Sequence, residues 1–314
     1  MPAGENSGHI SQEPAGLFLL ANFIFTSIKI LFSTKKLSFY IFALISFPLS
    51  FFLFLFSFIT YPLKISIQHL EELSLFSPIL VESGHVLEEA SKEAKSLLFL
   101  KFLFFFPTFL LSFFTAIAAV DVAFSVCSNG KPTVLTAFTA VKTVWKRVLV
   151  TTMCVYAIML ACTVVPGMLI AYFKTYPFIR VVIVVLGSGL ELHLMAVTSL
   201  ALVVSVNEGK YGFDAIRFGS GLMEGKRICG WVLSGLFVLF SGIVRGMIEM
   251  SMNGWDFVRV ESTVVIKLLL DNVVWIFLYA LVVQWSFIVT TVFYFDLKKR
   301  DSIKSDRDSE ISLI

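Results

Sequence analysis

Charge is the property that this sequence lacks most. Only 15% of its 314 residues are Asp, Glu, Lys or Arg, whereas soluble domains average about 25%. The net charge of +3 is too small to indicate nucleic-acid binding. The shortage is concentrated in six long stretches. Five are uncharged runs, which separate Lys36 from Lys64, Lys101 from Asp121, Arg147 from Lys174, Arg227 from Arg245, and Asp271 from Asp296; the sixth, Val181 to Val206, is apolar except for Glu191 and His193.

These runs have the length of membrane-spanning helices. The hydrocarbon core of a bilayer needs about 20 apolar residues per helical span, and the run after Lys36 alone has 27 uncharged residues. Lipid cannot satisfy exposed backbone groups, and the runs are too long for strands. We therefore predict an all-α fold, a polytopic bundle of six transmembrane helices with additional interfacial amphipathic helices. The predicted spans are residues 37–61, 97–120, 148–173, 178–204, 228–250 and 267–295.

Cysteine and histidine are also scarce, with four of each. The cysteines lie in predicted spans or on the predicted cytosolic side, where disulfides are not expected. The histidines form no H-E-x-x-H or similar metal-binding pattern, so we expect no metal and no other cofactor. Because no paired catalytic groups recur at helical spacing, we also expect no enzymatic activity.

The distribution of basic residues predicts the orientation. If the N-terminus is cytosolic, the segments on that side are 1–36, 127–147, 207–227 and 296–314, and they hold 16 of the 25 Lys and Arg residues. The positive-inside rule then places both termini in the cytosol. No basic segment follows Met1, so a cleavable signal peptide is not expected. We predict a multi-pass protein of the secretory pathway or plasma membrane.

The segment before the first span has an amphipathic pattern. Its polar residues Asn22, Thr26, Lys29 and Ser33 recur at steps of four, three and four, which is one face of a helix. We predict an interfacial helix, and a re-entrant segment is the alternative. The predicted organisation is a disordered N-terminus at 1–15, this helix at 16–36, the transmembrane domain at 37–295, and a disordered cytosolic tail at 296–314.

Two predicted inner loops resemble each other. One runs from Asn129 to Arg147 and the other from Glu208 to Arg227; each begins with Gly-Lys near its start and closes with Lys-Arg. The apolar residues between recur at helical spacing, which predicts a short amphipathic helix in each loop. The similarity indicates either an internal repeat or independent adaptation to the membrane surface.

The second of these loops resembles a loop in a plant family of uncharacterised six-span membrane proteins. The matching residues are Glu208, Gly212, Ala215, Ser220, Leu222, Gly225 and Lys226. The same pattern is similar, more distantly, to the membrane region of some bacterial glycerophosphodiester phosphodiesterases. The resemblance implies a six-span fold over about residues 16–300. It implies no phosphodiesterase activity, because the soluble catalytic domain of those enzymes is missing here.

Glu191 is the most unusual single residue, because a carboxylate in the middle of a span is costly and is a functional candidate by default. We predict an intramembrane ion pair between Glu191 and Arg245, which lie at similar depths in their spans. Such a pair would lock the bundle or form a substrate or proton site. The alternative is that Arg245 pairs with Glu249, one turn further along the same helix.

Three glycines of the fifth predicted span are spaced for helix packing. Gly235, Gly242 and Gly246 are separated by seven and four residues, and the last two form a GxxxG pattern. Small residues let helices approach closely in membranes. We predict a tight contact here, within the bundle or in a homo-oligomer.

The sequence as a whole predicts a non-enzymatic scaffold, lipid-interacting module or trafficking factor. Its expected partners are membrane lipids and other membrane proteins, or further copies of the chain, and no nucleic acid. The alternative is a transporter or channel for a small solute or a lipid, with Glu191 in the pathway.

Overall fold

The protein is helical throughout the part of the chain that the structure describes. This computed structural model describes residues 13–76, 80–128, 130, 134–173, 176–253 and 262–311, and these contain no strand. The elements are α1 (Glu13–Ser33), α2 (Lys35–Ile41), a π-helical turn (Phe42–Ser46), α3 (Phe47–Phe76), α4 (Leu80–Cys127), α5 (Val134–Tyr172), α6 (Pro177–Asn207), α7 (Phe213–Leu222), α8 (Arg227–Met252) and α9 (Ser262–Ile311).

Six helical segments are long and apolar enough to cross a membrane, which confirms the predicted fold class. Their mean hydropathies range from 1.8 to 2.3. The segments are Lys36–Ile67, Ser91–Cys127, Phe138–Ile170, Pro177–Asn207, Arg227–Met252 and Val265–Ile303, and each contains most of one predicted span.

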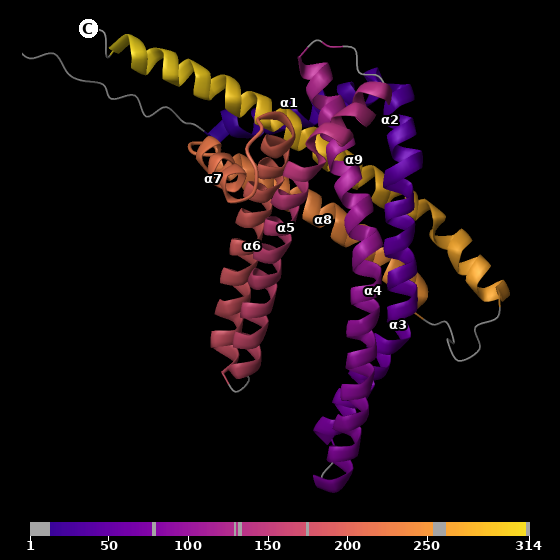
Figure 1. Cartoon of the computed structure of the whole chain (residues 1–314). Helices are drawn as coiled ribbons and strands as arrows, with labels where there is room; N and C mark the ends of the chain where they lie inside the picture. The colour runs from indigo at the N-terminus through magenta and orange to yellow at the C-terminus, as the bar shows by residue number, and fades with distance from the viewer. Residues whose placement is uncertain are drawn as a thin grey trace, which may run out of the picture.

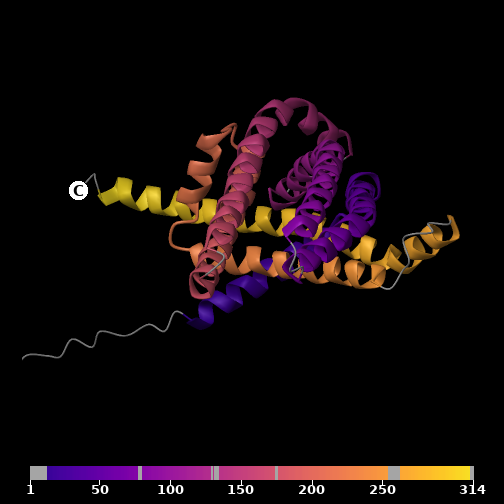
Figure 2. The ribbon, with the colours of Figure 1, turned by 90° about the horizontal axis from the view of Figure 1, so that it is seen from below.

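The spans are arranged as two hairpins and an oblique pair. Helices α3 and α4 pack side by side, as do α5 and α6, and α4 also contacts α5. The two hairpins diverge toward their free ends (Figure 1). Helices α8 and α9 pack together and cross the hairpins obliquely (Figure 2). The N-terminal helices, α7 and the end of α9 lie at the same end of the molecule, which we call the α7 end.

One face of helix α1 packs against the protein, and the other exposes polar residues together with Phe25 and Phe32. Leu20, Phe23 and Ile30 are buried, whereas Asn22 and Lys29 of the predicted polar face are exposed. The ring of Phe23 lies 5.6 Å from that of Phe293 on α9. Trp285 Nε1 of α9 also donates a hydrogen bond to Ser27 Oγ at 2.9 Å. Helix α1 is therefore attached to α9, and its placement at the membrane interface stays a prediction.

The two inner loops differ in structure. The second contains the predicted short helix, which is α7. The first does not, because α5 begins at Val134 and continues unbroken into its span, so the separate helix predicted there is wrong. The physical difference is glycine: Gly225 adopts a φ of 86° between α7 and α8 and lets the chain turn. No glycine interrupts the first loop after Val134 before the span begins.

The tail of the chain also departs from the prediction. Residues 296–311 were expected to be disordered, and instead they continue α9 to Ile311. No glycine or proline follows Asp296 to end the helix. The expected disorder at 1–15 lies mostly outside the described residues, since α1 begins at Glu13.

Candidate functional site

The second inner loop begins with a charged side chain that is held by α9. Glu208 follows the last residue of α6 and is largely buried. Its Oε1 atom accepts a hydrogen bond from the hydroxyl of Tyr294 and lies 2.7 Å from Nζ of Lys298. Tyr294 and Lys298 are four residues apart on α9, so they present one face to the loop. This cluster ties the end of α6 to α9.

The same cluster sets the ionisation of Glu208. Burial raises the pKa of this carboxyl, but hydrogen bonds from Lys298 and Tyr294 and the charges of Lys298 and Lys210 outweigh burial and hold the pKa below its ordinary value of 4.5. In the folded protein the carboxylate therefore stays charged to a lower pH than it does in the unfolded chain.

This shift predicts how stability depends on pH. The contribution of Glu208 is fully present above its ordinary pKa and is lost as the pH falls through the lowered pKa of the folded state. We expect the apparent melting temperature of the detergent-solubilised protein to fall below about pH 4.5. In the Glu208→Gln variant the fall should be smaller. The apparent melting temperature is measured by heating the protein and following the folded fraction by size-exclusion chromatography. The same dependence of this temperature on pH in the variant and the wild type would contradict the prediction.

The end of the same loop is held by α9 as well. Lys226 Nζ lies 2.5 Å from Asp296 Oδ2. Arg300 donates to the backbone carbonyls of Leu222, at 3.4 Å, and of Glu224. These carbonyls lie at or just beyond the end of α7, where helices leave acceptors unsatisfied. The α7 segment is therefore fastened to α9 at both of its ends.

Close packing and one backbone hydrogen bond hold the middle of the loop. Gly212 has a φ of 62°, and its N–H donates to Thr151 Oγ1 of α5 at 2.9 Å. Gly219 of α7 lies so close to α6 that an added Cβ would be 3.2 Å from the backbone nitrogen of Ala201. Ala215 is completely buried. Gly212 and Ala215, which belong to the loop pattern of the sequence analysis, thus serve to pack and to hydrogen-bond this loop.

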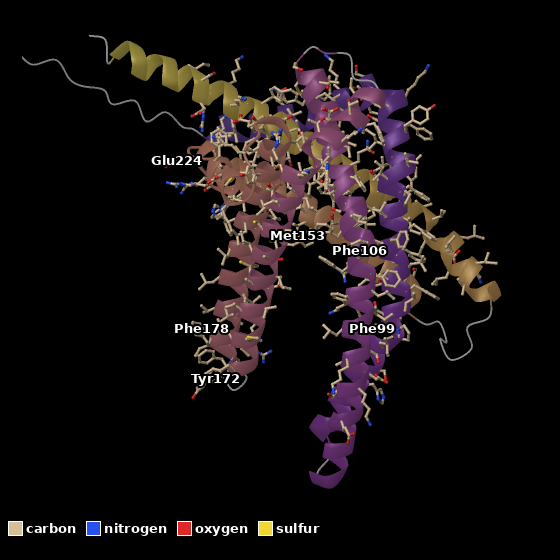
Figure 3. All side chains as sticks on the ribbon, viewed as in Figure 1. Phe99, Phe106, Met153, Tyr172, Phe178 and Glu224 are labelled. Carbon is tan, nitrogen blue, oxygen red and sulfur yellow. The ribbon has the colours of Figure 1, made fainter. Side chains whose placement is uncertain are left out.

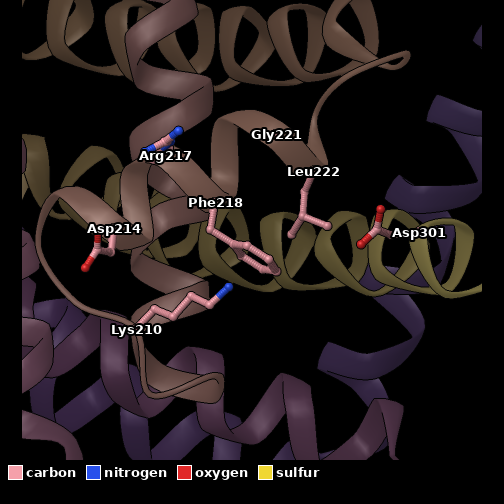
Figure 4. A pocket seen from close by; sticks show the side chains of 7 residues that line it. All are labelled: Lys210, Asp214, Arg217, Phe218, Gly221, Leu222 and Asp301. Carbon is pink, nitrogen blue, oxygen red and sulfur yellow. The ribbon is translucent and has the colours of Figure 1, made fainter. Parts of the chain in front are cut away.

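A groove runs along the exposed side of α7 (Figure 4). Its volume is about 630 Å³. It is lined by Lys210, Asp214, Arg217, Phe218, Gly221, Leu222 and Asp301. Two cations and two carboxylates border it, and Lys210 Nζ lies 3.2 Å from the centre of the Phe218 ring. The groove therefore has no net charge, and no group of three or more metal-binding side chains occurs among the described residues.

The predicted ion pair between Glu191 and Arg245 is wrong. Arg245 Nε instead lies 3.4 Å from Glu249 Oε1, which is the alternative that helical spacing offered. The same oxygen is 3.4 Å from Nζ of Lys64 on α3. Sequence reasoning missed Lys64 because a contact between α3 and α8 leaves no periodic signal. Near Glu191, His193 Nδ1 accepts a hydrogen bond from Trp231 Nε1 at 2.8 Å and so joins α6 to α8.

The predicted glycine contact does not form within the chain. An added Cβ at Gly242 or Gly246 would meet nothing within 4 Å among the described residues, and one at Gly235 would lie 4.0 Å from Leu192. The GxxxG pattern therefore lies on an open part of α8, and a contact there in a homo-oligomer stays a prediction. The close glycine contact occurs at Gly219, which the sequence analysis did not assign to packing.

Comparison with known proteins places the chain in a family without assigning an activity. No curated protein and no solved structure matches it significantly. The model of one family, described as a domain of unknown function (DUF8558), matches residues 11–307. This match covers all six apolar spans, the second inner loop and the part of α9 that holds this loop. The chain therefore belongs to the DUF8558 family.

Proposed function

We propose that the protein is a non-enzymatic, lipid-interacting membrane protein whose two hairpins hold acyl chains between them. The observation that carries this proposal is the low burial of the spans. In an apolar stretch of 18 residues in each helix, only 17% of residues are buried in α5 and in α6, and only 22% in α8. Most of the surface of these helices is therefore available to lipid.

Large apolar side chains lie at and beside the contact between the two hairpins. The hairpins meet where the ring of Tyr156 on α5 lies 5.6 Å from Phe105 and 5.3 Å from Phe109 of α4. At this contact and further toward the N-terminal end of α4, Phe106, Phe102 and Phe99 are 66%, 77% and 67% exposed. Figure 3 shows Phe99 and Phe106 on α4 and Met153 on α5.

An apolar surface of this kind fits acyl chains. We call the region between the N-terminal half of α4 and the C-terminal half of α5 the wedge; its residues are Phe99, Phe102 and Phe106 of α4 and Leu160, Val164 and Met168 of α5. Phe99, Phe102 and Phe106 recur at steps of three and four and so form one face of α4. On α5 the exposed residues include Leu160, Val164 and Met168. None of these side chains is charged, so the expected ligand is hydrocarbon and not a polar solute. Glu191 lines none of the cavities described here, which gives the transport alternative no further support.

The arrangement at the α7 end supports a cytosolic location of both termini. The segments that hold most Lys and Arg residues include the helix N-terminal to the first span, the α7 loop and the end of α9, and these lie together at this end (Figure 1). We propose that this end faces the cytosol of a compartment of the secretory pathway or the plasma membrane. A trafficking or scaffold role is compatible with this location.

Lipid retention tests the proposed function. A photoreactive amino acid is placed at Phe102, in the wedge, and the protein is washed through several detergent exchanges before illumination. We expect a crosslinked phospholipid in the mass spectrum. An acyl chain that contacts both α4 and α5 should dissociate more slowly than one that contacts a single helix. Position Leu186 on α6, which is 68% exposed, is the matched control and should lose its lipid. Equal loss at both positions would refute lipid binding in the wedge.

A further inference from the structure

A small, mostly apolar cavity that also has several polar side chains in its wall lies between α3, α8 and α9. Its volume is about 120 Å³. Its polar lining consists of Ser50, Ser57, Lys64, Arg245 and Tyr279, and the rest is apolar. We call it the outer cavity. It is separate from the groove along α7, and no residue of the wedge described above lines it.

The charges at the outer cavity do not balance. Oε1 of Glu249 lies 3.4 Å from Nζ of Lys64 and 3.4 Å from Nε of Arg245. One carboxylate therefore serves two cations, and a net positive charge remains. The structure gives the two Nη groups of Arg245 no hydrogen bond within the described residues. These groups are available to an anion.

The position of these charges corresponds to lipid head groups. Lys64 and Glu249 each lie three residues before the end of their apolar segments, which end at Ile67 and Met252, and Arg245 lies seven residues before the end, one helical turn deeper. A charge in the hydrocarbon centre is costly, whereas basic residues near the membrane surface attract anionic lipids. We therefore expect the excess positive charge of Lys64 and Arg245 to be balanced by an anionic group at the depth of the lipid head groups.

A buried hydroxyl in the cavity also lacks a partner. Ser57 Oγ is inaccessible to solvent and makes no hydrogen bond. Ser50 Oγ, on the same face of α3, donates to the carbonyl of Ile276 at 2.6 Å and is satisfied. A buried polar group without a hydrogen-bond partner destabilises the fold. Ser57 thus offers an unused donor in the cavity wall, which a change of rotamer would turn toward a bound polar atom.

We infer that the outer cavity binds the phosphate of an anionic phospholipid. The guanidinium of Arg245 offers a planar pair of donors that matches two phosphate oxygens. Lys64 adds a second positive charge, and Ser57 donates a hydrogen bond to the phosphate. One acyl chain lies against the apolar lining from α3 and α8. This inference rests on the proposed lipid interaction and adds to it a head-group class and a site.

The test measures the binding of defined lipids to the purified full-length protein by native mass spectrometry. Phosphatidylglycerol is the anionic probe, phosphatidylcholine has the same phosphate in a neutral head group, and inorganic phosphate is the free anion. We expect phosphatidylglycerol to bind most tightly. Equal binding of phosphatidylcholine would overturn the preference for anionic lipid, and competition by inorganic phosphate at equal concentration would show that the site takes a free anion.

Three variants locate the site. Arg245→Gln should weaken phosphatidylglycerol binding by about tenfold or more, which corresponds to the loss of a charge-assisted hydrogen bond. Ser57→Ala should weaken it by about fivefold. Arg180→Gln, an exposed arginine near the start of α6, is the matched control and should bind as the wild type does.

Arg245→Lys keeps the charge and removes the planar pair of donors, so it tests the site even if Arg245→Gln fails to fold. Wild-type affinity in both Ser57→Ala and Arg245→Lys would overturn the inference. Such a result would refute the outer cavity as a lipid site and would leave the proposed lipid binding at Phe102 standing. Conversely, if no lipid is crosslinked at Phe102 but phosphatidylglycerol is still preferred, only the proposed binding in the wedge is refuted.

Discussion

Replacing Gly219 by Leu is expected to destabilise the protein by about 3 kcal/mol, the upper part of the range for overpacked positions. An added Cβ would lie 3.2 Å from the backbone nitrogen of Ala201 and 3.4 Å from the carbonyl oxygen of Val197. Both are backbone atoms of α6, which cannot move aside as a flexible side chain does. The longer side chain must therefore separate α7 from α6. The free energy of unfolding, measured by titration with sodium dodecyl sulfate in mixed micelles, reports this change.

Gly221, two residues further along α7, provides the control. An added Cβ there would meet nothing within 4 Å. Because alanine is the better helix former, Gly221→Ala should be neutral or stabilise the protein by about 0.5 kcal/mol. If Gly219→Leu is as stable as Gly221→Ala, then α7 does not pack against α6 as the structure shows.

Replacing Glu208 by Ala is expected to cost about 2 kcal/mol, the typical loss of a hydrogen bond to a charged group. The substitution leaves the Tyr294 hydroxyl and the Lys298 ammonium without their shared acceptor. Because these two side chains connect α9 to the end of α6, the substitution should also loosen the α7 loop. Faster proteolysis between Glu208 and Arg227 would show this loosening, and the free energy of unfolding would show the loss of stability.

The matched control is Glu224→Gln, in the same loop. Glu224 lies 3.9 Å from Arg227, and both side chains are mostly exposed. Exposed ion pairs contribute about 0–1 kcal/mol, so this variant should unfold nearly as the wild type does. Similar losses in Glu208→Ala and Glu224→Gln would mean that general loop charge, and not the contact with α9, stabilises this region.

The spans could be predicted from the sequence because their signal is local. A run of uncharged residues has to be long enough to cross the bilayer, whatever its neighbours are. The ion pairs could not be predicted in the same way. Glu191 and Arg245 have compatible depths, but a pair also requires the two helical faces to point toward each other. That orientation depends on how α8 crosses α6, which sequence spacing does not encode.

The glycine contacts could not be predicted from the sequence pattern either. The GxxxG pattern at Gly242 and Gly246 is a recognised packing signal, yet both positions are open in the chain. Gly219 belongs to no such pattern and makes the close approach. Its signal was the amphipathic spacing of α7, which places it on the same face as Ala215 and Leu222. The family resemblance also identified Ala215 and Leu222, without showing why they matter.

Helix α9 connects the two ends of the molecule as a single rod. It has 50 residues, which corresponds to a length of about 75 Å. No glycine or proline interrupts it, so it lacks the usual points of bending. It carries Tyr279 at the outer cavity and Tyr294, Lys298 and Arg300 at the α7 loop. If a lipid head group binds at the outer cavity as we propose, a tilt or rotation of α9 imposed there would also move the residues that hold the α7 loop.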